Sequence, residues 1–398
     1  MILPRLAANR IQNLLTVFPV VVVTGPRQSG KSTLLKHLLP GYRYVTFDLQ
    51  SVRELFEQDR LGFVRALGQR VILDEVQKVP AVFEVIKVLV DENWQSGAFV
   101  LTGSAQFPLV KGLESLAGRC GFQSLLPFQV SEIPREQTGV PELTGFYPEL
   151  VLRGGEMARE WYDGYVTTYL ERDVRDLLAV TNLNDFRKVV GLLAARTGQE
   201  LNLSSIAREA GINERTVNAW VSVLEASYLV FLVRPWHNNL GKRLVKRPKL
   251  YFWDTGLVCF LTGIRTMEQL ESGPMAGTLF ENFVVADLHK TALHGGFDQR
   301  FSYFRTNAGV EIDLLVEAFD QQSLTLLEVK RRATPKADDT KSLRAVLSAP
   351  GLLPEGWSAQ GLVVLTEGAV QPITAQVQAV GAPQLLRETA RQGLAFWP

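Results

Sequence analysis

The chain has 398 residues, and its 42 Lys and Arg against 41 Asp and Glu leave a formal net charge of +1. The length predicts two to three domains, and 46% hydrophobic with 21% charged residues excludes a disordered or collagen-like chain. Two cysteines exclude a disulfide framework, and no apolar run approaches the roughly 18 residues that cross a bilayer. Without a signal-peptide pattern, these features predict a soluble, cytoplasmic protein. Taken as an average, the balanced charge argues against a nucleic-acid partner.

Residues 1–135 alternate short apolar runs with helical patterns, the order typical of a parallel α/β sheet. The runs are almost continuous in Val, Ile, Leu and Phe, as expected of strands buried on both faces. The predicted strands cover residues 19–24, 44–49, 70–74, 98–102 and 121–126. Helical patterns at 31–39 and 81–90 lie between them. We expect one α/β domain here.

A complete G-x-x-x-x-G-K-[ST] pattern follows the first predicted strand and opens the helix at 31–39. In this context the glycines let the backbone wrap closely around phosphates, and the N–H groups of the loop and the helix N-terminus attract the anion. Lys31 would reach the β- and γ-phosphates of ATP, and Ser32 would bind Mg²⁺. The predicted nucleotide-binding residues are Gly25, Arg27, Gln28, Ser29, Gly30, Lys31, Ser32 and Thr33.

An acidic pair, Asp74 and Glu75, ends the third predicted strand. Downstream of a phosphate-binding loop, one such carboxylate holds Mg²⁺ and the other polarises the attacking water. We therefore predict that Asp74 acts at the metal and that Glu75 activates water, with Lys31 as the third catalytic group. The alternative is a solvated turn or a helix cap. A protein that only binds ATP would be expected to lack Glu75.

Hydroxyl side chains, Thr102 and Ser104, end the fourth predicted strand, and Arg119 precedes the fifth. The order of these parts resembles the AAA+ class of ATPases. The resemblance implies that Thr102 or Ser104 helps to orient water. It also implies that Arg119 is an arginine finger, which stabilises charge on the γ-phosphate bound by a neighbouring subunit. The alternative for Arg119 is a local ion pair, for example with Glu114.

Four segments together resemble a prokaryotic family that joins an AAA-type ATPase domain to a C-terminal domain long described only as of unknown function. They are residues 25–33, 73–77, 101–104 and 169–175. The resemblance extends over nearly the whole chain and implies an ATPase that uses ATP and Mg²⁺. Arg172 and Arg175, three residues apart on one helix face, would form a second phosphate sensor or a surface ion-pair face.

After a linker and helical region at 136–184, residues 185–265 resemble a winged helix-turn-helix. A short helix, a turn at Gly211 and an Asn213 cap lead into a helix over 214–226, which is followed by strands at 228–234 and 249–253. Six Lys or Arg and no acidic residue lie between positions 226 and 253, a pattern that favours contact with DNA phosphates. The predicted DNA contacts are Arg215, Thr216, Lys242, Arg243, Lys246 and Arg247. The alternative is a packing or oligomerisation module.

Residues 270–398 resemble the PD-(D/E)xK restriction-endonuclease-like α/β fold. Asp313 lies on a predicted strand at 311–318, and Glu328 and Lys330 share a face of the next one, 324–330. The resemblance adds Glu281 on the preceding helix. Asp313, Glu328 and Glu281 would hold Mg²⁺, with Lys330 orienting water. The alternative is a hairpin with an exposed ion pair, and folds of this kind also serve as inactive DNA-binding modules.

The fold class expected is therefore α/β: a P-loop AAA+ parallel-sheet domain, a winged helix-turn-helix and a C-terminal endonuclease-like domain. The leading hypothesis is a homo-oligomeric ATPase, in a ring such as a hexamer, that moves or remodels DNA without a membrane partner. Branched DNA such as a Holliday junction is expected by analogy with nuclease-like folds. The alternatives are a nucleotide-switched regulator of a protein partner and an ATP-gated, Mg²⁺-dependent nuclease.

Overall fold

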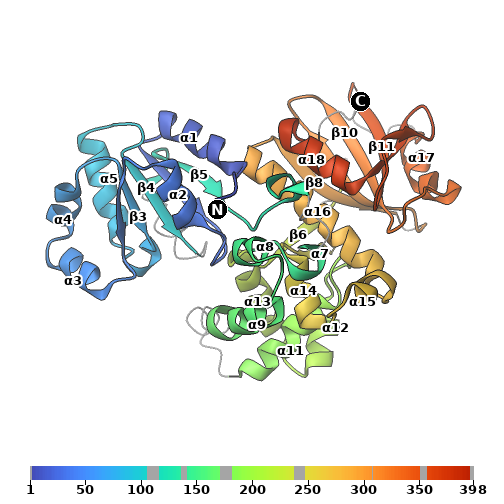
Figure 1. Ribbon diagram of the computed structural model, residues 1–398, viewed down its shortest axis with the longest axis horizontal. Coiled ribbons are helices and arrows are strands. Elements are labelled where there is room, and N and C mark those ends of the chain that lie inside the picture. The colour runs from blue at the N-terminus through green and yellow to red at the C-terminus, as the bar shows by residue number, and fades with distance from the viewer. Residues whose placement is uncertain are drawn as a thin grey trace. The chain divides into compact units, whose positions relative to one another are not determined.

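The computed structural model describes residues 2–104, 116–135, 141–170, 182–236, 247–306, 308–349 and 356–394. The chain forms two compact units (Figure 1). The N-terminal unit contains residues 1–128 and two short later segments, 226–228 and 293–295. The C-terminal unit contains residues 129–225, 229–292 and 296–398.

A five-stranded parallel sheet is the centre of the N-terminal unit, with the strand order β2-β3-β4-β1-β5. The strands are β1 Val20–Thr24, β2 Arg43–Thr46, β3 Val71–Asp74, β4 Phe99–Gly103 and β5 Cys120–Ser124. Each overlaps a predicted strand. The predicted parallel α/β sheet, which is typical of P-loop ATPase domains, is therefore confirmed.

Helices cover both faces of this sheet, as the alternating side chains of β1 show. Val20 and Val22 pack in one hydrophobic core, whereas Val21 and Val23 pack in another. The helices are α1 Ala7–Val17, α2 Lys31–Leu38, α3 Gln50–Gln58, α4 Arg60–Leu67 and α5 Val82–Glu92, with a 3-10 turn over Val76–Lys78. Because the strands are parallel, their carboxyl ends meet at one edge, where the phosphate-binding loop lies beside the end of β3.

Helices form the first part of the C-terminal unit, around a core that includes Phe186 and Trp220. They are α7 Pro141–Thr144, α8 Pro148–Leu152, α9 Ala158–Tyr165, α11 Leu183–Ala194, α12 Leu203–Ala210, α13 Glu214–Ala226, α14 Thr255–Thr262, α15 Met267–Ser272 and α16 Ala276–Gly295. A 3-10 turn, Val130–Glu132, precedes them. Within the helical region predicted at 136–184, α9 continues as a π-helical stretch, Val166–Leu170. Arg172 and Arg175 lie outside the described residues.

An eight-stranded mixed sheet completes the C-terminal unit, in the order β12-β13-β11-β10-β9-β8-β6-β7. Its strands are β6 Val230–Pro235, β7 Lys249–Phe252, β8 Gln299–Arg305, β9 Glu311–Ala318, β10 Ser323–Val329, β11 Ser358–Leu365, β12 Gln371–Pro372 and β13 Val377–Gly381. The remaining elements are a 3-10 turn Ala337–Thr340 and the helices α17 Lys341–Leu347 and α18 Ala382–Gln392. The β9–β10 hairpin was predicted almost to the residue.

The hairpin of β6 and β7 is continuous with the C-terminal strands. β7 pairs antiparallel with β6, and β6 pairs parallel with β8 through Arg234 and Pro235. The sheet therefore contains strands from both of the predicted regions, residues 185–265 and residues 270–398. Among the described residues, no helix is long and apolar enough to span a bilayer.

Candidate functional site

The phosphate-binding loop connects β1 to α2 through a sharp backbone turn. A Cβ at Gly25, where φ is 149°, would lie 2.1 Å from the carbonyl oxygen of Leu125, so only glycine fits. Gly30, with φ of 91°, is the residue from which α2 starts. The turn directs the N-terminus of α2, with its N–H groups and positive dipole end, toward the loop. This is the geometry expected of a phosphate-binding site.

The other predicted loop residues differ in burial. Ser29 is fully buried, and its hydroxyl has no hydrogen-bond partner within the described part of the chain. Gln28 and Thr33 are exposed, and Arg27 is half-buried. A buried hydroxyl without a partner is costly, and a phosphate oxygen at the loop would relieve that cost.

Lys31 starts α2 and turns its side chain back onto the loop. It is 6% exposed, and its Nζ donates to the carbonyl oxygens of Gly25 at 3.0 Å and Pro26 at 2.8 Å. Burial lowers the pKa of Lys31 to about 8, although Glu75 and Asp74 partly oppose the shift. The ammonium is therefore surrounded by neutral carbonyls rather than paired directly with a carboxylate.

Asp74, at the end of β3, accepts hydrogen bonds from three hydroxyl groups. Ser32 Oγ donates to its Oδ2 at 3.0 Å, and Thr102 Oγ1 donates to its Oδ1 at 2.5 Å. The Tyr44 hydroxyl on β2 also donates to Oδ2, and burial together with this bond raises the pKa of Tyr44. A carboxylate and a serine hydroxyl beside a phosphate-binding loop form a donor set that fits Mg²⁺ bound with a nucleotide.

Glu75 follows Asp74 in a left-handed conformation, with φ of 58°. Gln77 Nε2 donates to Glu75 Oε2 at 2.5 Å and to Ser104 Oγ at 3.4 Å. Burial raises the pKa of Glu75, as expected of a carboxylate that could accept a proton. Gln77 thus links Glu75, the predicted water-activating residue, to Ser104, which directly follows β4.

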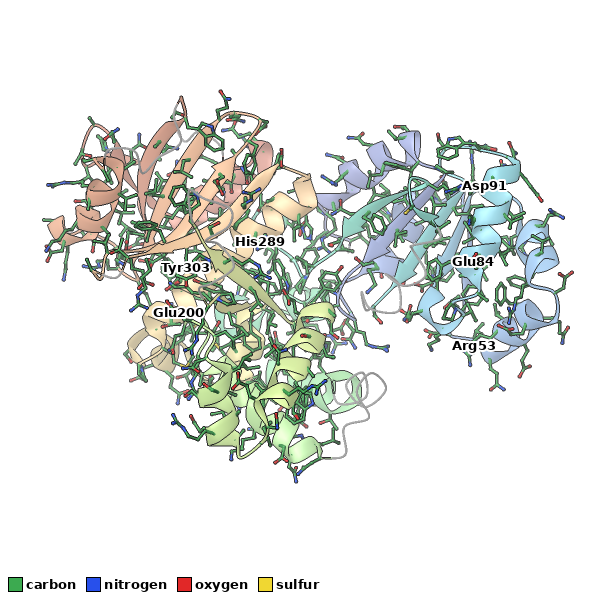
Figure 2. All side chains as sticks on the ribbon, turned by 180° about the vertical axis from the view of Figure 1, so that it is seen from behind. Arg53, Glu84, Asp91, Glu200, His289 and Tyr303 are labelled. Carbon is green, nitrogen blue, oxygen red and sulfur yellow. The ribbon has the colours of Figure 1, made fainter. Side chains whose placement is uncertain are left out.

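Arg119 is part of a local ion pair in the N-terminal unit. Its Nε lies 2.6 Å from Asp91 Oδ1, and its terminal nitrogen donates to Oδ2 at 3.1 Å. Asp91 belongs to α5 (Figure 2). This pairing lowers the pKa of the Asp91 carboxyl. Glu114, which we weighed as its partner, lies outside the described residues.

The predicted DNA contacts are only partly described. α12 ends at Gly211, which is in the left-handed conformation, and Asn213 Oδ1 accepts from the Arg215 N–H at 2.8 Å at the start of α13. The side chains of Arg215 and Arg247 are exposed and that of Thr216 is half-buried. The other predicted contacts, Lys242, Arg243 and Lys246, lie outside the described residues.

The predicted C-terminal ligands approach one another from α16, β9 and β10. Lys330 Nζ lies 2.7 Å from Glu328 Oε2 and 3.6 Å from Asp313 Oδ2. Burial, and the charge of Asp313 beside them, raise the pKa values of Glu281 and Glu328. In the described ranges, however, no group of three or more His, Cys, Asp or Glu side chains is arranged to hold a metal ion.

Sequence reasoning missed three residues that these sites use: Tyr44, Gln77 and Lys249. Tyr44 reaches Asp74 only because β2 and β3 are neighbours in the sheet. Gln77 was visible as a polar residue two positions after Glu75. Lys249 is one of the six basic residues between positions 226 and 253 that were expected to favour DNA contact, yet it forms ion pairs with Glu281 and Glu311.

Three protein-family models match successive parts of the chain. Residues 17–134 match the family described as "AAA domain". Residues 142–268 match "Domain of unknown function (DUF8612)", and residues 276–385 match "Domain of unknown function (DUF4143)". The AAA match and the site geometry support an AAA-type ATPase.

Two solved structures illustrate how far the structural likeness extends. The Walker-type ATPase Paby2304 of Pyrococcus abyssi is 15% identical, with a TM-score of 0.45 over 64% of this chain and 94% of that one. RuvB of Thermotoga maritima is 17% identical, with a TM-score of 0.28 over 56% of this chain and 88% of that one. Both scores are low.

Two curated relatives match much more of the sequence. They are the uncharacterized proteins Rv2008c of Mycobacterium tuberculosis and Mb2031c of Mycobacterium bovis, each 33% identical over 345 residues. The alignments cover 86% of this chain and 76% of each relative. The chain therefore belongs to the same protein family as these two mycobacterial proteins.

Proposed function

We propose that the protein hydrolyses ATP at the carboxyl edge of the N-terminal sheet. The main support is that Lys31 and Ser32, at the start of α2, lie close to Asp74, at the end of β3, beside the phosphate-binding loop. Ser32 Oγ lies 3.0 Å from Asp74 Oδ2. The match of residues 17–134 to the AAA family supports it. Half-buried Glu75, next in sequence, adds a group that would accept a proton from water.

Each side chain has a distinct task in the proposed reaction. Ser32 and Asp74 would hold Mg²⁺, which neutralises phosphate charge when bound. Lys31 would move its Nζ from the loop carbonyls to phosphate oxygens, where its charge is stabilised. Glu75, positioned by Gln77, would orient the attacking water and accept its proton.

A substitution at Glu75 tests this hydrolysis directly. Glu75→Gln should retain ATP binding and lower turnover by about a hundredfold or more, because the amide cannot accept the proton. Glu84→Gln, on the exposed side of α5 (Figure 2), is the matched control and should keep wild-type turnover. Turnover would be measured as phosphate release, and binding as nucleotide titration. Unchanged turnover in Glu75→Gln would remove Glu75 from the mechanism.

DNA is the partner that we propose for this ATPase, with ATP turnover driving movement or remodelling of bound DNA. The support is a helix–turn–helix followed by a hairpin, with Arg215 and Arg247 exposed. The other contacts proposed from the sequence, Lys242, Arg243 and Lys246, lie outside the described residues. Contacts of this kind act mainly on phosphates and are insensitive to base sequence.

The DNA proposal predicts a salt-dependent change. Arg215→Glu with Arg247→Glu should weaken binding and reduce the slope of log affinity against log salt by about two, because about one contact is lost per arginine. Lys341→Glu with Arg344→Glu, both exposed on α17, is the charge-matched control. Binding would be measured with a linear duplex and a four-way junction, alongside DNA-stimulated ATP turnover. If both variants bind DNA alike and DNA leaves turnover unchanged, a regulator of a protein partner becomes the better proposal.

A ring-shaped homo-oligomer, such as a hexamer, would allow Arg119 to act on ATP in a neighbouring subunit. Arg119 would first have to leave Asp91, its partner in the isolated chain. Mixing an Arg119→Ala protein with a Glu75→Gln protein should then restore part of the activity, since each supplies the group that the other lacks. Confirmed mixed assemblies without any recovery would contradict the role in trans.

A further inference from the structure

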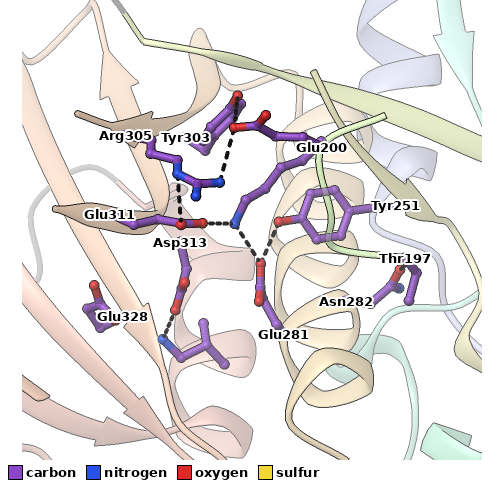
Figure 3. Close-up of polar contacts among 12 residues, drawn as sticks. Thr197, Glu200, Tyr251, Glu281, Asn282, Tyr303, Arg305, Glu311, Asp313 and Glu328 are labelled. Carbon is purple, nitrogen blue, oxygen red and sulfur yellow. Dashed lines mark hydrogen bonds and ion pairs between the residues drawn. The ribbon is translucent and has the colours of Figure 1, made fainter. Parts of the chain in front are cut away.

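Lys249 lies among the carboxylates that the sequence predicts as Mg²⁺ ligands, although it belongs to the β6–β7 hairpin. Its side chain is buried, with 4% of the residue exposed. Its Nζ lies 2.8 Å from Glu311 Oε1 and 3.4 Å from Glu281 Oε1. In Figure 3, dashed lines mark the ion pairs made by Glu281 and Glu311, whereas Asp313, drawn beside them, pairs with Lys330.

The pleat of β7 explains why the hairpin reaches this cluster. Residues two apart in a strand share a face, so Lys249 and Tyr251 project together. The Tyr251 hydroxyl donates to Glu281 Oε1 at 2.6 Å, the same oxygen that lies near Lys249. Burial and this neighbouring carboxylate raise the pKa of Tyr251. One strand therefore supplies both a cation and a hydrogen-bond donor to Glu281.

A second lysine, Lys330, pairs with the other two predicted ligands, Glu328 and Asp313. Lys330 Nζ is 2.7 Å from Glu328 and 3.6 Å from Asp313. We call these six residues the acidic cluster: Lys249, Glu281, Glu311, Asp313, Glu328 and Lys330. Two ammonium groups thus lie where the sequence predicts one divalent cation, which carries the same total charge.

Lys249 is held in this environment by direct ion pairs. Its buried ammonium group contacts carboxylate oxygens of both Glu311 and Glu281. A buried ammonium held in this way repels an incoming metal ion and occupies carboxylate oxygens that the ion would need. The described arrangement therefore does not fit the predicted Mg²⁺ ion.

We propose that Lys249 is an internal cation that keeps the acidic cluster free of metal, and that the cluster binds a divalent, oxygen-preferring cation only when this charge is removed. The hairpin proposed to contact DNA thereby also supplies a positive charge to the C-terminal carboxylates. The inference is independent of ATP hydrolysis, because every group in it belongs to the C-terminal unit.

Titration with Mn²⁺, followed by calorimetry, tests the proposal. All proteins would carry Asp74→Asn, so that the nucleotide site does not bind the ion. The parent protein should show no Mn²⁺ site that depends on Asp313. Lys249→Met should gain one site that binds Mn²⁺ about tenfold or more above the weakest binding detectable in the parent, because uncompensated buried carboxylates favour a cation. Adding Asp313→Asn should abolish that gain.

Two control variants separate the position of the charge from its simple loss. Lys290→Met removes another buried lysine, on α16 outside the acidic cluster, and should gain no Mn²⁺ site. Lys249→Arg retains the charge and should also remain without one. A second readout is Tb³⁺ luminescence sensitised by Tyr251, with Tyr44→Phe added to remove the tyrosine beside Asp74.

Two results would overturn the proposal. One is a Lys249→Met protein that binds Mn²⁺ no tighter than Lys290→Met. The other is a parent protein that already binds Mn²⁺ and loses it with Asp313→Asn. If Lys249→Met does not fold, the variant Lys249→Met with Glu311→Gln keeps the net charge of the acidic cluster and carries the same test. Absence of a gained site in that folded variant would overturn the proposal equally.

Discussion

The nucleotide site and the acidic cluster both place lysines near carboxylates at strand ends, but they use the lysines in opposite ways. At the nucleotide site, Lys31 donates to backbone carbonyls, and Asp74 is held by hydroxyl groups. In the acidic cluster, Lys249 and Lys330 pair with carboxylates directly. The pKa of Lys31 is lowered to about 8 by burial, whereas that of Lys249 is raised because the surrounding carboxylates outweigh burial.

This difference separates a site whose lysine faces backbone carbonyls from one whose lysines already pair with carboxylates. A buried ammonium facing only carbonyls gains when an anion arrives, and a carboxylate held by hydroxyls can exchange them for a metal ion. A buried ammonium that already pairs with carboxylates is not further stabilised in this way by an incoming anion. The same residue types therefore imply binding in one unit and internal charge compensation in the other.

The largest expected effect is on folding stability. Lys249→Met should lower the free energy of unfolding by about 3 to 5 kcal/mol, because it leaves buried carboxylates without a partner. Lys31→Met should cost less than about 1 kcal/mol or stabilise the protein, since burial already disfavours that charge. Urea unfolding followed by fluorescence would measure both. Equal losses of unfolding free energy in the two variants would contradict the difference between the two sites.

The next effect concerns nucleotide affinity. Lys31→Ala should weaken ATP binding by about a hundredfold or more, because charge-assisted hydrogen bonds to phosphate are lost. Lys341→Ala, at the exposed start of α17, should leave the affinity unchanged. Titration with a fluorescent ATP analogue would provide the dissociation constants. Comparable affinity in both variants would show that Lys31 does not contact the nucleotide.

Asp287, a buried carboxylate outside both sites, adds a test of pH dependence. Asp287 is buried on α16 and accepts from the Val130 N–H at 2.8 Å. Burial raises its pKa to about 7, despite opposing effects of Lys290 and Arg387. The folded state thus holds a proton that the unfolded chain releases near pH 4, so stability is fully present below about pH 4 and falls as pH rises toward about 7.

Asp287→Asn should remove this slope, since the amide oxygen still accepts from Val130 and carries no proton equilibrium. Between about pH 5 and 6.5 the wild type should lose about 2 kcal/mol more than the variant. Chemical unfolding at a series of pH values would show the difference. Parallel curves would mean that Asp287 is ionised in the folded protein and that Lys290 compensates it.

The smallest expected effect is at Tyr44. Tyr44→Phe removes one of three hydroxyls on Asp74 and should change the Mg²⁺ concentration for half-maximal ATP turnover by about threefold to tenfold. Tyr42→Phe is the control, because its hydroxyl donates to Gly97 O at 2.7 Å, away from Asp74. A change in maximal turnover with no change in Mg²⁺ dependence would argue against a role of Tyr44 at the metal.

Local features were predictable where one short segment carries the whole signal. The phosphate-binding loop needs Gly25 and Gly30 at fixed positions, and the strand before it is continuously apolar, so both its fold and its location followed from the pattern. The β9–β10 hairpin was likewise readable from alternating and apolar runs. Strands β8 and β13 were not predicted, because their segments are too short to show a clear hydrophobic pattern. Pairing with neighbouring strands makes them strands in the folded protein.

Residue types and spacing were enough to establish the parallel α/β unit and its loop, since helix and strand periods and glycine conformations are local properties of the chain. Which charges meet was decided only by tertiary structure. Lys249 and Glu311 are 62 positions apart in the sequence yet lie 2.8 Å apart, because β7 and β9 belong to one sheet. Sequence placed Lys249 in a basic hairpin, whereas folding placed it among carboxylates, where burial makes pairing obligatory.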